Sequence, residues 1–261
     1  MGLTSQSYGI WTARARFNLP VGNPGQYIVA LAGNPNTGKS TVFNALTGLR
    51  QHTGNWPGKT VLQARGSYTC KGRVFNLVDL PGTYSLLANS ADEQVARDFL
   101  CLARPDVTIV VADATCLERN LNLTLQVTEI TPNVVLCVNL IDEARRKDIT
   151  VDFAALSREL GVPVVPTAAS LGEGLKQLQK AVFDVALGKR VISPKKIVYH
   201  SEIEEAISML EPQLQELLGD RINHRWVSLR ILEGDQSMLQ SIADYLGHTP
   251  GQSLPLSEVP A

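Results

Sequence analysis

The apolar residues follow two patterns in turn along the chain. One pattern is typical of strands and the other is typical of helices. Short runs of Val, Ile and Leu without a polar side predict strands that are buried on both faces. Stretches with apolar residues every three or four positions predict helices between them. The expected strands are 27–32, 61–69, 73–78, 107–112, 134–138 and 162–166, and the expected helices are 39–46, 117–130, 152–160 and 172–187.

This alternation predicts an α/β fold, a mostly parallel sheet with helices on both faces. The turn at Lys71-Gly72 joins two of the strands as a hairpin. After Lys189 the pattern changes, because the later stretches are helical by period and no strand separates them. These helices are 201–218, 222–232 and 235–246. A small all-helical domain is therefore expected to follow the α/β domain.

The changes of pattern also predict where the domains begin and end. The expected parts are a flexible leader (1–26), an α/β domain (27–188), a linker (189–199), a helical domain (200–247) and a proline-rich linker tail (248–261). A membrane helix needs about 20 mostly apolar residues. The apolar runs are much shorter, as in 134–138, so no membrane span is expected in these 261 residues.

The amino-acid composition of the chain argues against some classes of function. The 24 basic and 25 acidic residues give a net charge of −1, which argues against a general electrostatic nucleic-acid binder. The basic residues of the linker are interpreted as solvated, with contact to lipid headgroups as the alternative. The 4 cysteines show no C-x-x-C spacing, so they are expected to be reduced thiols, mostly in the core.

One motif predicts a phosphate-binding loop. Residues 33–40, GNPNTGKS, match G-x-x-x-x-G-K-[ST] between an expected strand and an expected helix. Glycines let the backbone turn its N–H groups toward phosphates, at a helix N-terminus that favours anions. Lys39 would reach the β- and γ-phosphates, and the Ser40 hydroxyl would bind Mg²⁺. The expected contacts in this loop are Gly33, Asn36, Thr37, Gly38, Lys39, Ser40 and Thr41.

Two further segments have the order of nucleotide switches. Asp79-Leu-Pro-Gly82 follows an expected strand, where Asp79 could hold Mg²⁺ through water and the Gly82 N–H could sense a γ-phosphate. The Gly- and Pro-containing loop 51–60 could order around a nucleotide. Thr60 is the expected second hydroxyl ligand of Mg²⁺, and Thr53 competes for this role.

Asn139 and Asp142 favour guanine as the base. The Asp142 carboxylate could accept from both N1–H and the 2-amino group, whereas adenine offers neither donor. Leu140 stands where a lysine usually stacks on the base. A last base-contacting loop is expected after the final strand, through the backbone of Ala168 and Ala169.

The order of these motifs resembles a Ras-like P-loop GTPase. The strings GNPNTGKSTVFNALTG, HTGNWPGKTV, LVDLPGTYSL, DATCLERNLNLTLQ and NLIDEA closely resemble the N-terminal cytosolic region of the bacterial ferrous iron transport protein B family. The segment 225–235 resembles that family's small helical domain, described as similar to a guanine-nucleotide-dissociation inhibitor (GDI). The resemblance covers about residues 27–247.

This resemblance implies a GTPase that binds GTP and GDP with Mg²⁺, and it implies Asn36 as a ligand for K⁺. The residues expected to act in catalysis are Lys39, Thr60, Gly82 and Asn36. Many Ras-like enzymes place a glutamine directly after D-x-x-G to orient the attacking water. Thr83 occupies that position here, so slow intrinsic hydrolysis is expected.

The resemblance also implies a partner and a location. The chain is expected to regulate or drive ferrous iron uptake through a membrane transporter domain of the same full-length protein, absent from this chain, on the cytoplasmic side of the bacterial inner membrane. No nucleic acid is expected as a partner, and a homo-oligomer is left open. Two alternatives stay open, a soluble regulatory GTPase acting on ribosome or tRNA, and a nucleotide-dependent binding switch with incidental hydrolysis.

Overall fold

The computed structural model describes residues 24–48, 51–57, 61–87 and 90–246, together with residues 14, 17 and 19. It divides into two compact units. The sheet unit consists of Asn23–Leu100 and Pro105–Lys195, and the helical unit contains Cys101–Arg104 and the chain from Lys196 onward. Most of the leader predicted over 1–26 and the tail predicted over 248–261 lie outside the described residues.

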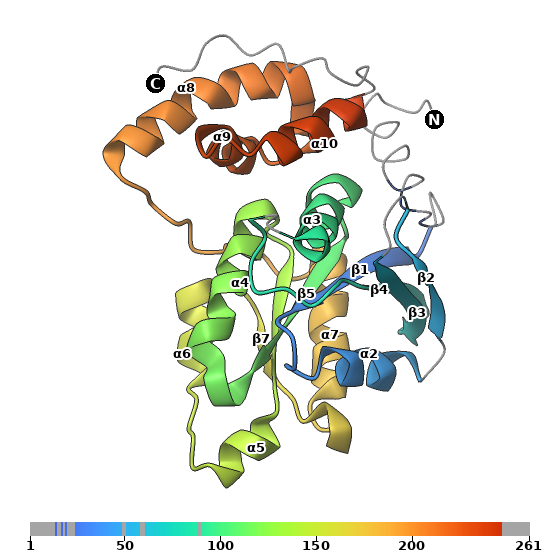
Figure 1. The fold of residues 1–261 in the computed structure, drawn as a ribbon. Helices are drawn as coiled ribbons and strands as arrows, with labels where there is room; N and C mark the ends of the chain where they lie inside the picture. Colours follow the sequence, from blue (N-terminus) through green and yellow to red (C-terminus); the bar gives the residue numbers. More distant parts are fainter. Residues whose placement is uncertain are drawn as a thin grey trace. The chain divides into compact units, whose positions relative to one another are not determined.

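The sheet unit is built on a seven-stranded sheet with the strand order β2-β3-β4-β1-β5-β6-β7 (Figure 1). The strands are β1 (Gln26–Gly33), β2 (Gln51–Asn55), β3 (Leu62–Cys70), β4 (Arg73–Asp79), β5 (Val107–Asp113), β6 (Val134–Asn139) and β7 (Val164–Pro166). Strands β4, β1, β5, β6 and β7 run parallel, and β2 and β3 add an antiparallel edge. The mostly parallel sheet expected from the sequence is confirmed.

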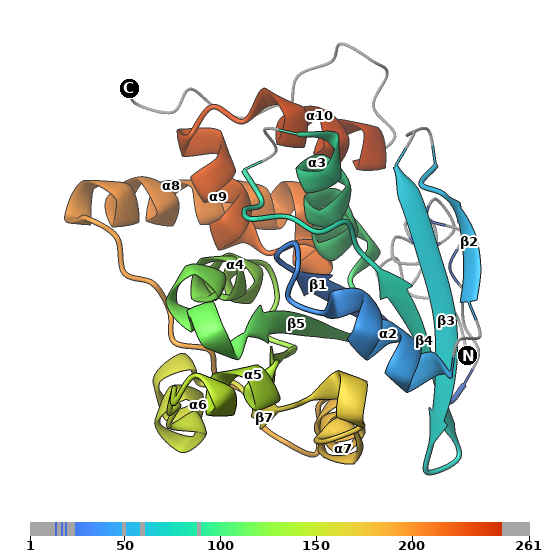
Figure 2. The ribbon, with the colours of Figure 1, turned by 60° about the horizontal axis from the view of Figure 1, so that its bottom comes forward.

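Helices cover both faces of the sheet, as Figure 2 shows for α4 on one face and α2 and α7 on the other. The helices of this unit are α2 (Lys39–Thr47), α3 (Ala91–Asp98), α4 (Leu117–Ile130), α5 (Ile141–Arg146), α6 (Phe153–Leu160) and α7 (Leu175–Ala186). Alternate strand residues such as Leu31 and Leu77 pack against Phe43 of α2 and Phe183 of α7. Strand side chains alternate between faces, so the apolar runs supply a core on each side.

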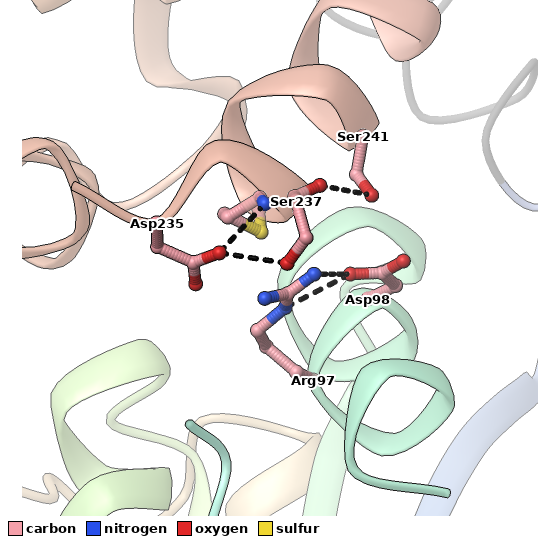
Figure 3. Close-up of polar contacts among 6 residues, drawn as sticks. Arg97, Asp98, Asp235, Ser237 and Ser241 are labelled. Carbon is pink, nitrogen blue, oxygen red and sulfur yellow. Dashed lines mark hydrogen bonds and ion pairs between the residues drawn. The ribbon is translucent and has the colours of Figure 1, made fainter. Parts of the chain in front are cut away.

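The helical unit contains α8 (Ser201–Leu218), α9 (His224–Leu232) and α10 (Gln236–Leu246). Leu210 and Leu214 of α8 and Trp226 of α9 are buried. Asp235 caps the start of α10, because its Oδ1 accepts from the Met238 N–H at 3.0 Å and from the Ser237 hydroxyl at 2.7 Å (Figure 3). Among the described residues, no helix combines the length and the apolar character that crossing a membrane requires.

Several short elements of the sheet unit were not predicted. The segment 51–60 was expected to be a loop, but Gln51–Asn55 forms β2 on the edge of β3. Its residues are mostly polar, and the backbone of β3 supplies the pairing that side-chain pattern cannot reveal. Helix α5 was not expected, since its six residues are too few to show a period. Phe99–Ala103, directly after α3, forms a π-helix, labelled η1.

An ion pair joins two helices of the helical unit. The guanidinium of Arg225 in α9 donates to Glu204 Oε2 at 2.7 Å and to Glu204 Oε1 at 2.6 Å. The Arg225 guanidinium also donates to the carbonyl of Ile197 at 2.9 Å. The hydrogen bonds from Arg225 lower the pKa of Glu204 from 4.5 to about 2. The pair therefore stabilises the folded unit wherever Glu204 is ionised.

We expect Glu204→Gln to lower the melting temperature at neutral pH and to lower it less at acidic pH. The pKa is lower in the folded state, so the stabilisation is complete above about pH 4.5 and is lost as the pH falls toward 2. Circular-dichroism melts of both proteins from about pH 7 to about pH 3 measure this. Glu202→Gln, at an exposed site in α8, is the control. A difference in melting temperature that stays constant with pH would contradict the assignment.

Candidate functional site

The predicted site residues gather at the carboxyl ends of the parallel strands. β1 lies between β4 and β5, so the connections from these strands leave the sheet in opposite directions. Ligands of open α/β sheets bind at such a switch point. The loops after β1, β4, β6 and β7 and the start of α2 meet there, and they carry the described residues that the sequence singles out for binding, except Thr53 on β2.

The loop after β1 has the backbone of a phosphate cradle. Asn36 and Gly38 have left-handed φ angles of 66° and 78°, which turn successive N–H groups to one side. A Cβ added to Gly38 would lie 2.4 Å from Asn139 Nδ2, and one added to Gly33 would lie 2.7 Å from the Val111 carbonyl. Gly38 precedes α2 and gives no side-chain cap to that helix. The free N–H groups at the start of α2 suit an anion.

Lys39 and Asp79 form the charged centre of the site. Lys39 Nζ forms an ion pair with Asp79 Oδ1 and donates to the Leu80 carbonyl at 2.7 Å. Only 11% of the Lys39 side chain and 18% of the Asp79 side chain are exposed. Burial raises the pKa of Asp79, and the charge and hydrogen bond of Lys39 oppose this shift. A phosphate and a metal ion could replace the two partners of this pair without adding an unpaired charge.

The Asp-Leu-Pro-Gly loop is attached to the strand that leads into the cradle. The Leu80 N–H donates to the Leu31 carbonyl at 3.0 Å, and the Thr83 N–H donates to the Gly33 carbonyl at 3.2 Å. Gly82 lies beside Pro35, since a Cβ on Gly82 would be 3.5 Å from Pro35 Cα. These contacts place Gly82 next to the phosphate loop, as predicted for a residue that senses a phosphate.

Asn139 joins three loops from inside the protein. Its side chain is 1% exposed, and Nδ2 donates to the Thr37 carbonyl at 3.0 Å. Its Oδ1 accepts from Thr167 Oγ1 and from the Ala169 N–H, each at 3.1 Å. Thr167 Oγ1 also lies 3.2 Å from Cys137 Sγ, and burial raises the pKa of Cys137 to about 12. Asn139 therefore holds the loops of the site together.

Asp142 presents an unused acceptor. It is in the first turn of α5, after Leu140 has taken a left-handed φ of 62°. Its Oδ2 lies 3.4 Å from the Arg146 guanidinium. Its Oδ1 is buried and has no hydrogen-bond partner among the described residues. A buried acceptor without a donor costs about 1–3 kcal/mol, so this oxygen suits a ligand that brings N–H groups.

The backbone of Ala168 and Ala169 is already hydrogen-bonded within the protein. The Ala168 N–H donates to the Glu173 carbonyl at 3.2 Å, and the Ala169 N–H donates to Asn139. Arg145 of α5 adds two hydrogen bonds to the Glu173 carboxylate, at 2.7 and 3.0 Å. Contact of these two amides with a base stays a prediction, and it would require the amides to share or exchange their present acceptors.

The remaining predicted residues differ in their surroundings. Asn36 is exposed in the phosphate loop, and Ser40 and Thr41 are exposed in the first turn of α2, where their oxygens could reach a ligand or a cation. Thr60 lies outside the described residues, and Thr53 is exposed on β2. Among the described residues, no group of three or more His, Cys, Asp and Glu could hold a metal ion.

The sequence reading did not assign two features of this site. The side chain of Thr167 was assigned no role from the sequence, yet its buried hydroxyl supports Asn139. Its position directly after a buried strand was the available signal. The pairing of Arg145 with Glu173 had no sequence signal, because both residues stand among other charged and polar positions.

A parallel sheet with this phosphate loop, Asp-Leu-Pro-Gly segment and Asn-Leu-Ile-Asp segment defines the class: a P-loop GTPase-type domain, followed here by a helical domain. Residues 27–182 match the family model of ferrous iron transport protein B. Residues 199–253 match the model of the FeoB cytosolic helical domain. The chain belongs to the ferrous iron transport protein B family.

The curated relatives that this chain matches are much longer than the chain itself. A fusion of Fe(2+) transport protein A and Fe(2+) transporter FeoB from Porphyromonas gingivalis is 38% identical over 220 residues, covering 83% of this chain and 26% of that protein. The Fe(2+) transporter FeoB of Salmonella typhimurium is 39% identical over 214 residues, covering 79% of this chain and 27% of that protein. The chain thus spans about a quarter of the length of these relatives.

Solved structures of FeoB cytosolic domains have the same fold. The cytosolic domain of the T. maritima iron transporter in apo form is 39% identical with a TM-score of 0.76, covering 87% of this chain and 88% of that one. The GMPPNP form of that domain gives the same values. The cytosolic domain of L. pneumophila FeoB is 34% identical with a TM-score of 0.72, covering 84% and 94% of the two chains.

We expect Gly38→Ala to destabilise the protein more than Gly48→Ala does. Both glycines have a left-handed φ, but a Cβ on Gly48 meets nothing within 4 Å, whereas one on Gly38 would collide with Asn139. Gly48→Ala should lower the free energy of unfolding by about 1–2 kcal/mol, and Gly38→Ala by about 2–4 kcal/mol. Urea unfolding measures both values. Equal losses would show that Asn139 does not constrain residue 38.

Proposed function

We propose that residues 27–188 form a domain that binds GTP and GDP and hydrolyses GTP slowly, with residues 200–247 as its attached helical domain. The observation that carries this proposal is the buried Asp142 Oδ1, which has no hydrogen-bond partner among the described residues. Guanine offers two adjacent donors, N1–H and the 2-amino group, whereas adenine offers neither. A site built to pair with such donors discriminates strongly against a base that lacks them.

The oxygen donors near the phosphate loop suit hard cations. We propose that Ser40, Thr60 and Asp79 hold Mg²⁺, and that Asn36 contributes to a K⁺ site. The exposed side chains of Ser40 and Asn36 support this proposal, as does Asp79, whose cationic partner among the described residues is Lys39. Bound Mg²⁺ would neutralise charge on the β- and γ-phosphates.

Hydrolysis would rest on positioning and charge. Lys39 and the N–H groups of the phosphate loop would stabilise the transferred phosphoryl group, and Gly82 would donate its N–H to the same group. Thr83 is 4% exposed, and its hydroxyl donates to the Ser85 carbonyl at 2.6 Å. Its side chain is therefore engaged in its own turn, which supports a slow intrinsic rate.

The comparisons support a role in iron transport. Relatives of this chain are named Fe(2+) transporters, and solved T. maritima neighbours include GDP and GMPPNP forms. We propose that the chain acts on the cytoplasmic side of the bacterial inner membrane, where its nucleotide state regulates or drives ferrous iron uptake through a membrane region of the same full-length protein. The transport step itself would belong to that region.

We expect Asp142→Asn to weaken GDP binding and to favour xanthosine diphosphate. The amide can no longer accept both guanine donors, and the loss of a charged hydrogen-bond pair corresponds to at least about a tenfold rise in Kd. Titration with fluorescent GDP and XDP in Mg²⁺ measures both affinities. Asp148→Asn, exposed just after α5, is the matched control. Unchanged GDP affinity in the Asp142 variant would contradict the proposed base recognition.

We expect K⁺ to accelerate GTP hydrolysis relative to Na⁺, by about tenfold or more if it stabilises the charge of the transition state. In Na⁺ the rate should be about 10⁻⁴–10⁻³ s⁻¹, the scale of Ras without an activator. Asn36→Gly keeps the left-handed backbone and removes the amide, so the K⁺ effect should disappear. Phosphate release in either salt tests this. A rate of about 1 s⁻¹ in Na⁺ without a partner would refute slow hydrolysis.

A further inference from the structure

Trp56 is a buried anchor in an otherwise exposed segment. Its neighbours Asn55 and Pro57 are exposed, whereas Trp56 is 2% exposed. The segment 51–60 is the one expected to respond to a nucleotide. Burying an indole at this point gives the polar strand β2 a large apolar attachment to the core.

The backbone of Trp56 closes the hairpin formed by β2 and β3. The last paired residues of the two strands are Asn55 and Leu62. Beyond them, the Trp56 N–H donates to the Val61 carbonyl at 2.9 Å. The two ends of the connection between the strands are therefore held together at the residue whose side chain enters the core.

The indole of Trp56 contacts Phe99. The two ring centroids lie 5.3 Å apart at an interplanar angle of 73°, an edge-to-face arrangement. Phe99 is 0% exposed and is the first residue of η1, the π-helix that continues α3. π-Helical insertions are frequent at functional sites. Trp56 thus touches the end of the helix that follows the Asp-Leu-Pro-Gly loop.

The start of α3 is connected to the phosphate loop by hydrogen bonds. Thr83 donates its N–H to the Gly33 carbonyl at 3.2 Å and its hydroxyl to the Ser85 carbonyl at 2.6 Å. Ser85 Oγ donates to Glu93 Oε1 in the first turn of α3 at 3.1 Å. Glu93 of α3 is therefore part of this connection. A displacement of Gly82 and Thr83 would therefore be transmitted to α3.

We propose that Trp56 and Phe99 couple residues 51–57 to residues 79–87, so that the two segments respond to a γ-phosphate together. The inference rests on the proposed function, because it presumes that the site distinguishes GTP from GDP. Trp56 and Phe99 are positioning residues, since they act on the two segments and contact no phosphate themselves. Two buried aromatic rings in contact transmit a displacement because protein interiors are closely packed.

The test is a double-mutant cycle on nucleotide preference. Trp56→Leu, Phe99→Leu and the double variant are titrated with fluorescent GDP and GMPPNP in Mg²⁺. Each single variant should reduce the preference for GMPPNP relative to GDP by about three- to tenfold, the range expected for an aromatic pair. The double variant should be no worse than either single variant. Trp56→Phe should retain most of the preference.

Phe75→Leu is the matched control for general loss of core packing. Phe75 is a 0% exposed aromatic of β4 that stacks on Tyr68 with centroids 5.1 Å apart. This variant should lower the melting temperature and leave the ratio of the two affinities unchanged. If Trp56→Leu does not fold, the ratio of GMPPNP affinity to GDP affinity in Phe99→Leu and in Trp56→Phe tests the coupling instead.

The outcomes separate the coupling from the proposed function. The coupling would be overturned if the effects of the two single variants on the affinity ratio simply add in the double variant. It would also be overturned if Phe99→Leu leaves this ratio unchanged. Neither result would affect the proposal that the protein binds nucleotide. Wild-type protein that binds neither GDP nor GMPPNP would overturn the proposed function and the coupling with it. Hydrogen exchange over residues 91–98 gives a second readout, since GMPPNP should slow it in the wild type and not in Trp56→Leu.

Discussion

The hydrogen bonds of one buried amide determine how the loops of the site are arranged. Asn139 contacts the phosphate loop, Thr167 and Ala169 at once. Its side chain is inaccessible to water, so each lost partner would leave a buried polar atom unpaired, at a cost of about 1–3 kcal/mol. The lack of space for a Cβ at Gly38 beside the Asn139 amide follows from this arrangement. The hydrogen bonds of Asn139 therefore connect the phosphate loop to the loops after β6 and β7.

The charged groups of the site are also paired where they are buried. Lys39 and Asp79 neutralise each other at the centre of the cradle, and neither charge is left unpaired in a region of low solvent access. A phosphate and its cation would supply equivalent partners to both groups, so binding exchanges partners and creates no new buried charge. Asp142 contributes the opposite case, an acceptor that lacks a donor among the described residues. Together these groups favour a ligand with an anionic end and an N–H-bearing end.

Much of the fold was predictable because local patterns agree with the tertiary structure. The apolar runs at 107–112 and 134–138 are strands, since a residue buried on both faces has no polar side to show. Strand β2 was missed, because its polar residues pair only where β3 offers a free edge. Helix α5 and the π-helix η1 are too short for a period to identify them. Trp56 could not be placed from the sequence, since its burial depends on Phe99, far along the chain.

Residues close together in the chain were sufficient to predict the α/β class, the phosphate loop and the position of the Asn-Leu-Ile-Asp segment after a buried strand. The tertiary structure decided which groups are already engaged. It showed that Asn139 supports the loops through Thr167, that the N–H groups of Ala168 and Ala169 have acceptors inside the protein, and that Trp56 is buried. These contacts join residues from different strands and helices. Such residues come within hydrogen-bond or ring-contact distance only when the fold sets the strand order and register.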